Sequence, residues 1–420
     1  MNRLHAMQDA DEIGTLQINV TSRLQNTPIE NATITLSFSG EPDETLESLQ
    51  TDESGQTQPV SLETPPLAYS MDSAQENQPF SLYTIQVRAE GYQPLSISGI
   101  EVLPTVKAIQ NVALAPLDYT GTVRQSIDIP VNTLFGDYPP KIEESEIKPL
   151  EESGEIVLSR VVIPEYIIVH DGPPTDSRAG NYYVRYRDYI KNVASSEIYA
   201  TWPDASIRAN VLAIMSFTLN RVYTEWYRNK GYNFTITSST AYDQKWSYGR
   251  TVYDTISRVV DEMFENYLSR PNVGQPILTQ YCDGRNVTCP NWLSQWGSKY
   301  LGDQGYSAVQ ILRNYYGSSI YINSADEVSG IPSSWPGYDL SVGASGAKVR
   351  QMQQQLNRIH QSYPAIPAVT ADGIFGSATK NAVQKFQSVF GLPANGIVDY
   401  PTWYKISEIY VGVSRIAELN

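Results

Sequence analysis

The spacing of apolar residues changes along this chain of 420 residues, and that change argues against one uniform fold. Near the start, apolar and polar residues alternate in short runs such as 16–20 and 34–38, which predicts strands. Near the end, apolar residues recur at helical spacing over 349–359 and 379–390. A chain of this length is also too long for one ordinary core. We therefore expect a multidomain protein with an N-terminal all-β sandwich, a central α+β domain and a C-terminal three-helix bundle.

Residues 14–118 have the sequence pattern of a small β-sandwich. A third strand-like run at 83–87 follows the turn TDESGQT, and the turn GYQP comes soon after it. The order of these pieces resembles the transthyretin-like, carboxypeptidase-regulatory family over about residues 14–116. That resemblance implies an accessory spacer or adhesion module, and the sequence shows no catalytic cluster in it. Residues 1–13 are expected to form a flexible tail.

Two stretches are predicted to separate the domains. Residues 119–160 include YPPKIEESEIKPLEESGE, a Pro- and Glu-rich segment that is typical of an exposed acidic linker. Ser, Gly and Pro cluster again before the last helices, which predicts a second linker at 326–340. The central domain is therefore expected at 161–325 and the helical module at 341–420.

The charge is uneven, and it restricts the partners. Residues 1–160 carry 24 acidic and 8 basic side chains, whereas the rest carry 21 and 22. An acidic front half disfavours nucleic acid, and a nearly neutral remainder suits an uncharged polymer such as glycan. No apolar run is long enough for a membrane helix. The start, MNRLHAMQDADEIG, lacks the apolar core of a secretory signal. We therefore expect that the protein is released by lysis, stays inside a spore-forming compartment, or has been trimmed.

Metal and cysteine chemistry is sparse. The three histidines, His5, His170 and His360, lie in different regions, and no paired zinc motif is present, so no metal or other cofactor is expected. His170 follows a strand-like run and is expected to be a buried or loop histidine. Cys282 and Cys289 lie seven positions apart and could form a disulfide, supply half a zinc site or remain free.

The C-terminal region contains a dense set of motifs. ADGIFGSAT lies between two predicted helices, where Gly373 and Gly376 permit a tight turn that Asp372 can brace. GLPANG ends the second helix, and Thr402 in TWYKI is expected to open a third. This arrangement resembles the peptidoglycan-binding-domain family over about residues 341–410. The resemblance implies a module that holds cell-wall fragments in a shallow groove, so peptidoglycan glycan strands are the expected partner.

The central domain contains one glutamate in an unusual setting. Asp204 is expected to cap a helix whose apolar face includes Ile207, Met215 and Trp226. Glu197 precedes this helix, between two serines and the apolar pair Ile198 and Tyr199. Poor solvation favours the neutral carboxyl and raises its pKa, as a general acid requires.

This stretch and the later SQWGSKYLGDQGYSAVQILRNYYG resemble the stage II sporulation protein D and amidase-enhancer family over about residues 163–322. The resemblance implies a lytic transglycosylase with Glu197 as its essential acid, in the cell wall or spore envelope of a bacterium. The family often has a histidine where this chain has Cys289. Its absence makes a zinc site doubtful, favours a disulfide between Cys282 and Cys289, and weakens the case for full activity.

Further residues are candidates for holding the sugar. Nineteen of the 29 tyrosines and five of the seven tryptophans lie between residues 161 and 325, and aromatic rings suit sugar faces. The expected substrate-binding residues are Ser294, Gln295, Trp246, Trp292, Trp296, Tyr315 and Tyr316. Asp188, Asp204 and Asp243 are possible second carboxylates only by their proximity in sequence.

Two other functions fit the same sequence. One is a non-catalytic peptidoglycan-binding scaffold, which the missing histidine favours. The other is a cell-wall amidase or peptidase, with or without zinc. Protein partners are not indicated by the sequence.

Overall fold

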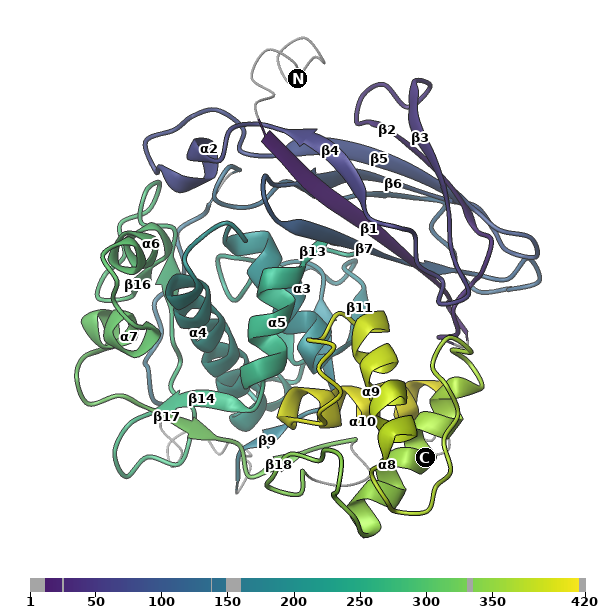
Figure 1. The fold of residues 1–420 in the computed structure, drawn as a ribbon. Coiled ribbons are helices and arrows are strands. Elements are labelled where there is room, and N and C mark those ends of the chain that lie inside the picture. Colours follow the sequence, from purple (N-terminus) through teal and green to yellow (C-terminus); the bar gives the residue numbers. More distant parts are fainter. Residues whose placement is uncertain (1–11, 25, 137, 149–159, 331–334, 415–420) are drawn as a thin grey trace.

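The computed structural model describes residues 12–414 except 25, 137, 149–159 and 331–334 (Figure 1). The coarse architecture predicted from the sequence is confirmed: a β-rich N-terminal part, a mixed middle part and C-terminal helices. No helix in these described ranges is long and apolar enough to cross a membrane. The tail predicted at 1–13 lies outside the described residues up to position 11, and a strand begins at Glu12.

The N-terminal part consists of two sheets that enclose a shared apolar core (Figure 1). Alternation along β1 buries Leu16, Ile18 and Val20, as expected for a strand with one face inward. One sheet has the order β13-β7-β1-β4 and the other the order β3-β2-β5-β6-β8. The elements of this part are β1 (Glu12–Ser22), β2 (Thr33–Phe38), β3 (Thr45–Gln50), β4 (Val60–Thr64), α2 (Ala68–Met71), β5 (Ser81–Arg88), β6 (Leu95–Val102), β7 (Lys107–Leu114) and β8 (Ser126–Asp128).

The sandwich and the middle part share a sheet. Strand β13 (Val252–Tyr253) belongs to the middle part in sequence, yet it pairs antiparallel with β7. Two polar contacts of Gln110 reinforce this edge: its amide donates to the Gly249 carbonyl at 2.9 Å and accepts from the Thr251 hydroxyl at 2.7 Å. The two parts are therefore joined through backbone pairing as well as side-chain packing.

The middle part is built around α4 (Asp204–Tyr223), which packs against α3, α5, α6, α7 and β14. We expected one apolar face on this helix, but 16 of its 20 residues are buried, so it is enclosed on all sides. Asp204 is its first residue and Pro203 its N-cap, without a side-chain cap, and Trp226 lies beyond its end. The helices around it are α3 (Tyr186–Glu197), α5 (Asp254–Met263), α6 (Gln295–Asp303) and α7 (Ala308–Tyr316).

Short strands surround these helices. A three-stranded sheet has the order β11-β10-β12, and three further pairs of strands join β14 with β17, β15 with β16 and β9 with β18. The strands are β9 (Val162–Ile163), β10 (Tyr166–His170), β11 (Asn181–Arg185), β12 (Ile236–Thr237), β14 (Asn266–Ser269), β15 (Tyr281–Cys282), β16 (Leu293–Ser294), β17 (Tyr321–Ser324) and β18 (Glu327–Val328), with a 3-10 turn η1 at Arg228–Lys230.

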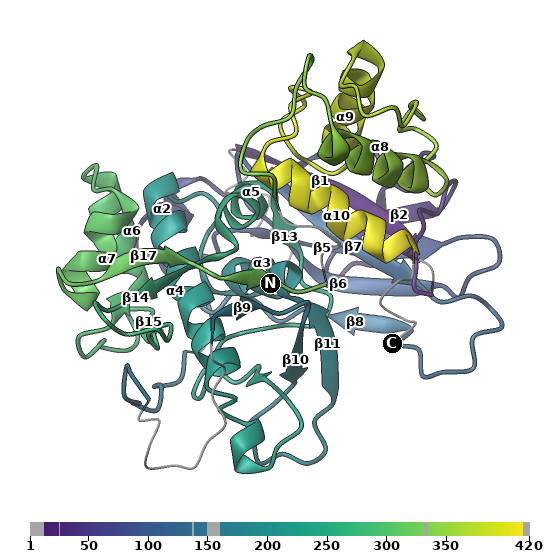
Figure 2. The same cartoon turned by 90° about the horizontal axis from the view of Figure 1, so that it is seen from below.

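Three helices form the C-terminal module: α8 (Ala347–His360), α9 (Ser377–Val389) and α10 (Tyr400–Ser414). The third begins at Tyr400, two residues before the predicted start. Figure 2 shows α10 beside α5, with α8 and α9 farther from the middle part. The module also contacts the sandwich, because the Gln56 amide donates to the Val389 carbonyl at 2.7 Å.

Two buried glutamines give this module an internal repeat that we did not predict. Gln353 accepts from the Gly373 backbone N–H at 2.8 Å and donates to the Ile374 carbonyl at 3.0 Å. Gln387 forms the same pair of bonds with Gly396, at 2.8 Å, and with the Ile397 carbonyl, at 2.8 Å. Both glycines have positive φ, 81° and 74°, which a side chain would disfavour. The recurring letters DGI and NGI are the signal that sequence reasoning could have used.

The predicted linker at 119–160 is only partly exposed over its described residues, so it differs from a free linker. Residues 126–128 form β8, and Tyr138, Lys141 and Lys148 are buried. We call residues 129–136 and 138–148 the strap, because these irregular segments contact the middle part through residues such as Lys141 and Glu144. Two of its acidic residues have cationic partners: Glu144 pairs with Arg221 at 2.6 Å and Glu146 with Arg270 at 2.7 Å. Residues 149–159 lie outside the described residues.

The second predicted linker is only partly described. Within 326–340, β18 pairs with β9, and the Trp335 ring packs edge-on against Trp403 of α10 at 6.1 Å. Residues 331–334 lie outside the described residues.

Candidate functional site

Glu197 is the last residue of α3, and its side chain is fully buried. Carboxylate Oε1 accepts the Lys245 backbone N–H at 2.7 Å. Oε2 and the nearby Tyr281 hydroxyl are both buried without a hydrogen bond of ordinary geometry among the described residues. One oxygen of this carboxyl is thus fixed by a backbone donor, while the other lies near the Tyr281 hydroxyl.

The surroundings of Glu197 favour its protonated form. Burial raises the pKa of its carboxyl, and the Lys141 ammonium, the Lys245 backbone N–H and the Tyr281 hydroxyl offset only part of that effect. A carboxyl that keeps its proton toward neutral pH can act as a general acid. The structure therefore agrees with the environment that the sequence predicted for this residue.

The strap contributes directly to the surroundings of Glu197. Tyr138 and Lys141 are buried there, and the Lys141 Nζ donates to the backbone carbonyl of Asp243. The same ammonium lies 4.7 Å from the centroid of the Tyr281 ring. Burial lowers the pKa of Lys141, while the negative charges of Glu197 and Asp243 oppose that change. The segment that the sequence suggested to be a linker is therefore part of the cover over Glu197.

The C-terminal end of α3 is held by donors from outside the helix. The last carbonyls of a helix have no partners within it. Asn132 of the strap donates its amide to the Ser195 carbonyl at 3.1 Å and to the Ile198 carbonyl at 3.2 Å. The Thr133 backbone N–H donates to the Ser196 carbonyl at 2.9 Å, and Arg250 donates to Ser195 at 2.8 Å.

None of the three possible second carboxylates lies in a catalytic arrangement with Glu197. Asp243 is buried, but it accepts from Arg221 at 2.7 Å and from the Tyr227 hydroxyl at 2.6 Å, so its charge is already paired. Asp204 pairs at the protein surface with two arginines. Asp188 is exposed in the first turn of α3, roughly 13 Å from Glu197 at 1.5 Å of helix rise per residue.

Most of the predicted sugar-binding aromatics are core residues in this conformation. Trp246, Trp296 and Tyr316 are buried, so their rings do not offer an open face to a sugar as the sequence suggested. The Trp296 ring packs 5.1 Å from that of Trp202, and the Tyr316 hydroxyl donates to a backbone carbonyl at 2.8 Å. The sequence could not distinguish these cases, because flat amphipathic rings suit both a protein core and a sugar face.

The remaining predicted contacts lie near the start of α6. Ser294 caps this helix by accepting the Gly297 backbone N–H at 2.9 Å. Gln295 is fully buried, and both its amide atoms lack hydrogen-bond partners among the described residues. Trp292 and Tyr315 are half-buried. Gln295 is thus the predicted substrate-binding residue with the most unused hydrogen-bonding capacity.

Cys282 and Cys289 form a disulfide, with 5.6 Å between their Cα atoms. The Asp283 carboxylate accepts two backbone N–H groups inside the closed loop, at 2.7 and 2.9 Å. Among the described residues, no group of three or more His, Cys, Asp or Glu side chains is arranged to hold a metal ion. His170 is buried and bonded to Asn181 at 2.8 Å, consistent with the expected structural role.

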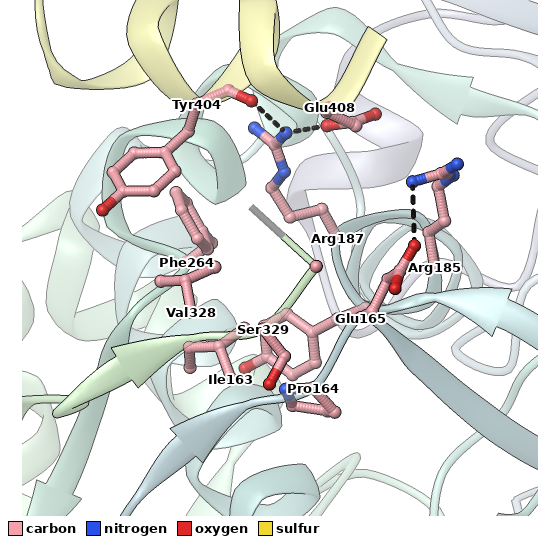
Figure 3. Close-up of a pocket in the computed structure, with 12 residues that line it drawn as sticks. Ile163, Pro164, Glu165, Arg185, Arg187, Phe264, Val328, Ser329, Tyr404 and Glu408 are labelled. Carbon is pink, nitrogen blue, oxygen red and sulfur yellow. Dashed lines mark hydrogen bonds and ion pairs between the residues drawn. The ribbon is translucent and has the colours of Figure 1, made fainter. Parts of the chain in front are cut away.

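A pocket that we did not predict lies where α10 meets the middle part (Figure 3). Arg187 points across it toward α10, where it pairs with Glu408 and donates to the Tyr404 carbonyl at 3.2 Å. On the other side, Arg187 pairs with the buried carboxylate of Asp261 at 3.3 Å. Phe264 and Val328 supply apolar lining. Arg187 and Glu408 of this pocket therefore help to dock the C-terminal module, whereas Arg185 pairs with Glu165 at 3.9 Å.

Comparison with known proteins supports the C-terminal prediction. Residues 345–406 match the family model described as a putative peptidoglycan binding domain, so the C-terminal module belongs to that domain family. A 76-residue stretch is 47% identical to the zinc D-Ala-D-Ala carboxypeptidase of Streptomyces albus G. That stretch covers 18% of this chain and 28% of the carboxypeptidase, so the chain spans under a third of that relative.

Two solved structures resemble parts of the chain. The N-terminal domain of SleB is 28% identical, and the match covers 18% of this chain and 99% of that one, with a TM-score of 0.16. The 5-hydroxyisourate hydrolase of Klebsiella pneumoniae is 21% identical, with 26% and 94% covered and a TM-score of 0.17. The family match at residues 345–406 supports association with the bacterial cell wall. The resemblance proposed for the middle part remains a prediction.

Proposed function

We propose that this protein binds peptidoglycan through its C-terminal module and cuts glycan strands with its middle domain. The observation that carries the proposal is the match of residues 345–406 to peptidoglycan-binding domains. The matched carboxypeptidase is, by its name, an enzyme that acts on a D-Ala-D-Ala bond, which is consistent with a wall-directed module in this chain. For the middle domain, the support is the buried carboxyl of Glu197, whose pKa is raised by burial.

The proposed reaction is a lytic transglycosylation. Glu197 donates its proton to the glycosidic oxygen that leaves the muramic sugar, and the bond from that oxygen to the anomeric carbon breaks. The 6-hydroxyl oxygen of the same sugar bonds to the anomeric carbon, and its proton passes to the Glu197 carboxylate. An intramolecular nucleophile makes the usual second carboxylate unnecessary. This agrees with Asp188, Asp204 and Asp243 lying in other roles.

Substrate access requires a change from the present conformation, because Glu197 has no exposed surface. Around Tyr138 and Lys141 the strap has no regular secondary structure, and both residues lie near Glu197. We expect this part of the strap to move aside when glycan binds. Gln295 would then offer its unpaired amide to sugar hydroxyls.

The decisive experiment is digestion of purified glycan strands, with and without stem peptides, by wild type and Glu197→Gln. Mass spectrometry identifies the ends of the products. Anhydro-ended fragments from wild type alone support the reaction and the role of Glu197. Freed stem peptides would instead indicate an amidase or peptidase. Either product could serve spore-wall remodelling, a role proposed here only from the resemblance in the middle part.

A second candidate is a non-catalytic scaffold, and the complete burial of Glu197 favours it. In that case the middle domain keeps the fold while the C-terminal module attaches the protein to the wall. Intact glycan after incubation with either variant, together with retained binding to wall sacculi, would select this function.

A further inference from the structure

The sandwich reaches the end of α3 through a buried ion pair. Glu101 lies on β6 and Arg250 in the middle part, and their side chains are about 1% exposed. The Arg250 guanidinium donates to both carboxylate oxygens of Glu101, with 3.3 Å to Oε1. The Asn132 backbone N–H donates to the same Oε1 at 2.7 Å. One carboxylate of the sandwich therefore orients two of the donors that hold the last turn of α3.

We propose that Glu101 is a positioning residue for Glu197, so that the sandwich completes the catalytic site rather than acting as a spacer. This inference rests on the proposed function of the middle domain. Arg250 and Asn132 both donate to the Ser195 carbonyl, two residues before Glu197. A cation at the C-terminal end of a helix is also favoured by the helix dipole. Glu101 acts through these groups and does not itself contact the reacting atoms.

The join between the sandwich and the middle part holds Glu101 and Arg250 in a fixed position relative to each other. β13 pairs with β7, and it begins two residues after Arg250. The Tyr253 hydroxyl donates to the backbone carbonyl of Glu101 at 3.2 Å. The Arg250 Nη1 also donates to the Pro130 carbonyl at 2.9 Å, at the start of the strap. Loss of the Glu101 charge would leave Arg250 buried without its counter-ion, and its hold on Ser195 would loosen.

The chain offers a matched control for the variant Glu101→Gln. Asp261 is also a buried carboxylate paired with an arginine of the middle part, Arg187, and with Lys191 at 2.7 Å. Arg187 and Lys191 lie in the first half of α3, away from Glu197. Asp261→Asn therefore removes a comparable buried charge without touching the end of the helix that carries Glu197.

The experiment compares glycan cleavage by wild type, Glu101→Gln, Glu101→Asp and Asp261→Asn in the full chain. A misplaced catalytic group can cost about a hundredfold in rate. We expect kcat of Glu101→Gln to fall to that extent with KM unchanged, Glu101→Asp to recover much of it, and Asp261→Asn to keep wild-type kcat. Equal losses in Glu101→Gln and Asp261→Asn would overturn the proposal, because they would reflect general destabilisation.

Hydrogen exchange separates this inference from the proposed reaction. The Ile198 backbone N–H donates to the Ala194 carbonyl at 3.0 Å and reports on the last turn of α3. Glu101→Gln should speed exchange at Ile198, and Asp261→Asn should not. Arg250→Lys, which keeps the charge but loses the forked donors, should also speed it and serves if Glu101→Gln does not fold. Unchanged exchange in both variants would overturn positioning, whereas faster exchange with no cleavage by wild type would refute only the proposed reaction.

Discussion

Replacing Arg221 with methionine tests how strongly the fold depends on charges buried in the middle part. The Arg221 side chain is fully buried. Its Nε donates to Asp243 at 2.7 Å, and its two terminal nitrogens donate to the Glu144 carboxylate at 2.6 and 3.0 Å. Methionine keeps much of the apolar stem but removes the Arg221 charge from both carboxylates, so that Glu144 keeps only Lys148 as its ion-pair partner.

The pKa of Glu144 sets the size of the expected effect. Burial alone would raise this pKa, but Arg221 and Lys148 lower it from its ordinary 4.5 to about 2. At about 1.4 kcal/mol per pKa unit, these cations stabilise the folded state by roughly 3 kcal/mol at neutral pH. Breaking a buried ion pair typically costs about 3–5 kcal/mol. Asp243 keeps donors from Tyr227 and Thr237, so we expect the lower end of that range.

The matched control is Arg258→Met. Arg258 also pairs with two carboxylates, Asp204 at 2.8 Å and Glu262 at 3.1 Å, but its side chain is 40% exposed. Exposed pairs are worth up to about 1 kcal/mol. Urea unfolding, followed by tryptophan fluorescence, should show this difference at pH 7. The loss of unfolding free energy in Arg221→Met should be smaller at pH 3. The depressed pKa of Glu144 stabilises the folded state fully only above the unfolded pKa, and this contribution is lost as pH falls toward about 2. Equal costs for the two variants, or a deficit that does not change with pH, would refute the reasoning.

Three further predictions concern single features. Glu197→Gln should raise the thermal stability at pH 7. Burial raises the pKa of Glu197 in the folded state, so the contribution of this carboxyl to stability falls as pH rises above its unfolded pKa, and glutamine has no such loss. The gain should vanish near pH 4, and a less stable variant at pH 7 would contradict it. Gln353→Ala and Gln387→Ala should each cost about 1–3 kcal/mol in thermal unfolding of the C-terminal module, since each leaves buried backbone groups unpaired; a cost at only one position would contradict the repeat. Replacing Cys282 and Cys289 with serine should cost about 2–3 kcal/mol in urea unfolding and speed hydrogen exchange over 283–288, and unchanged exchange there would contradict it.

Local pattern was enough to predict the elements at both ends of the chain. Alternation in β1 and helical spacing in α8 report directly which face is buried, so the strands of the sandwich and the helices of the module were predictable. The order of strands was not, because pairing between β1 and β7 depends on contacts about 90 residues apart. The enclosed helix α4 also misled the prediction, since its polar residues Asn210 and Thr218 are satisfied internally rather than by water.

The strap shows why a charged segment can be misjudged from sequence. Glu144 and Glu146 look like solvated linker residues beside their neighbours, but their partners lie 77 and 124 positions later in the chain. No local signal identifies Arg221 and Arg270 as those partners. A buried Lys141 is equally hard to foresee, because lysine is rarely buried without specific partners.

The candidate site shows the same division between local and distant information. The small and apolar neighbours of Glu197 were visible in the sequence, and the structure agrees that its carboxyl is buried. What fixes the end of its helix comes from elsewhere: Glu101 from the sandwich, Asn132 from the strap and Arg250 from the segment just before β13. A fragment limited to residues 161–325 would keep Arg250 but lose Glu101 and Asn132, leaving a buried cation unpaired and the Ile198 carbonyl without its donor. The unit that holds Glu197 in place is therefore larger than the domain that its sequence pattern defines.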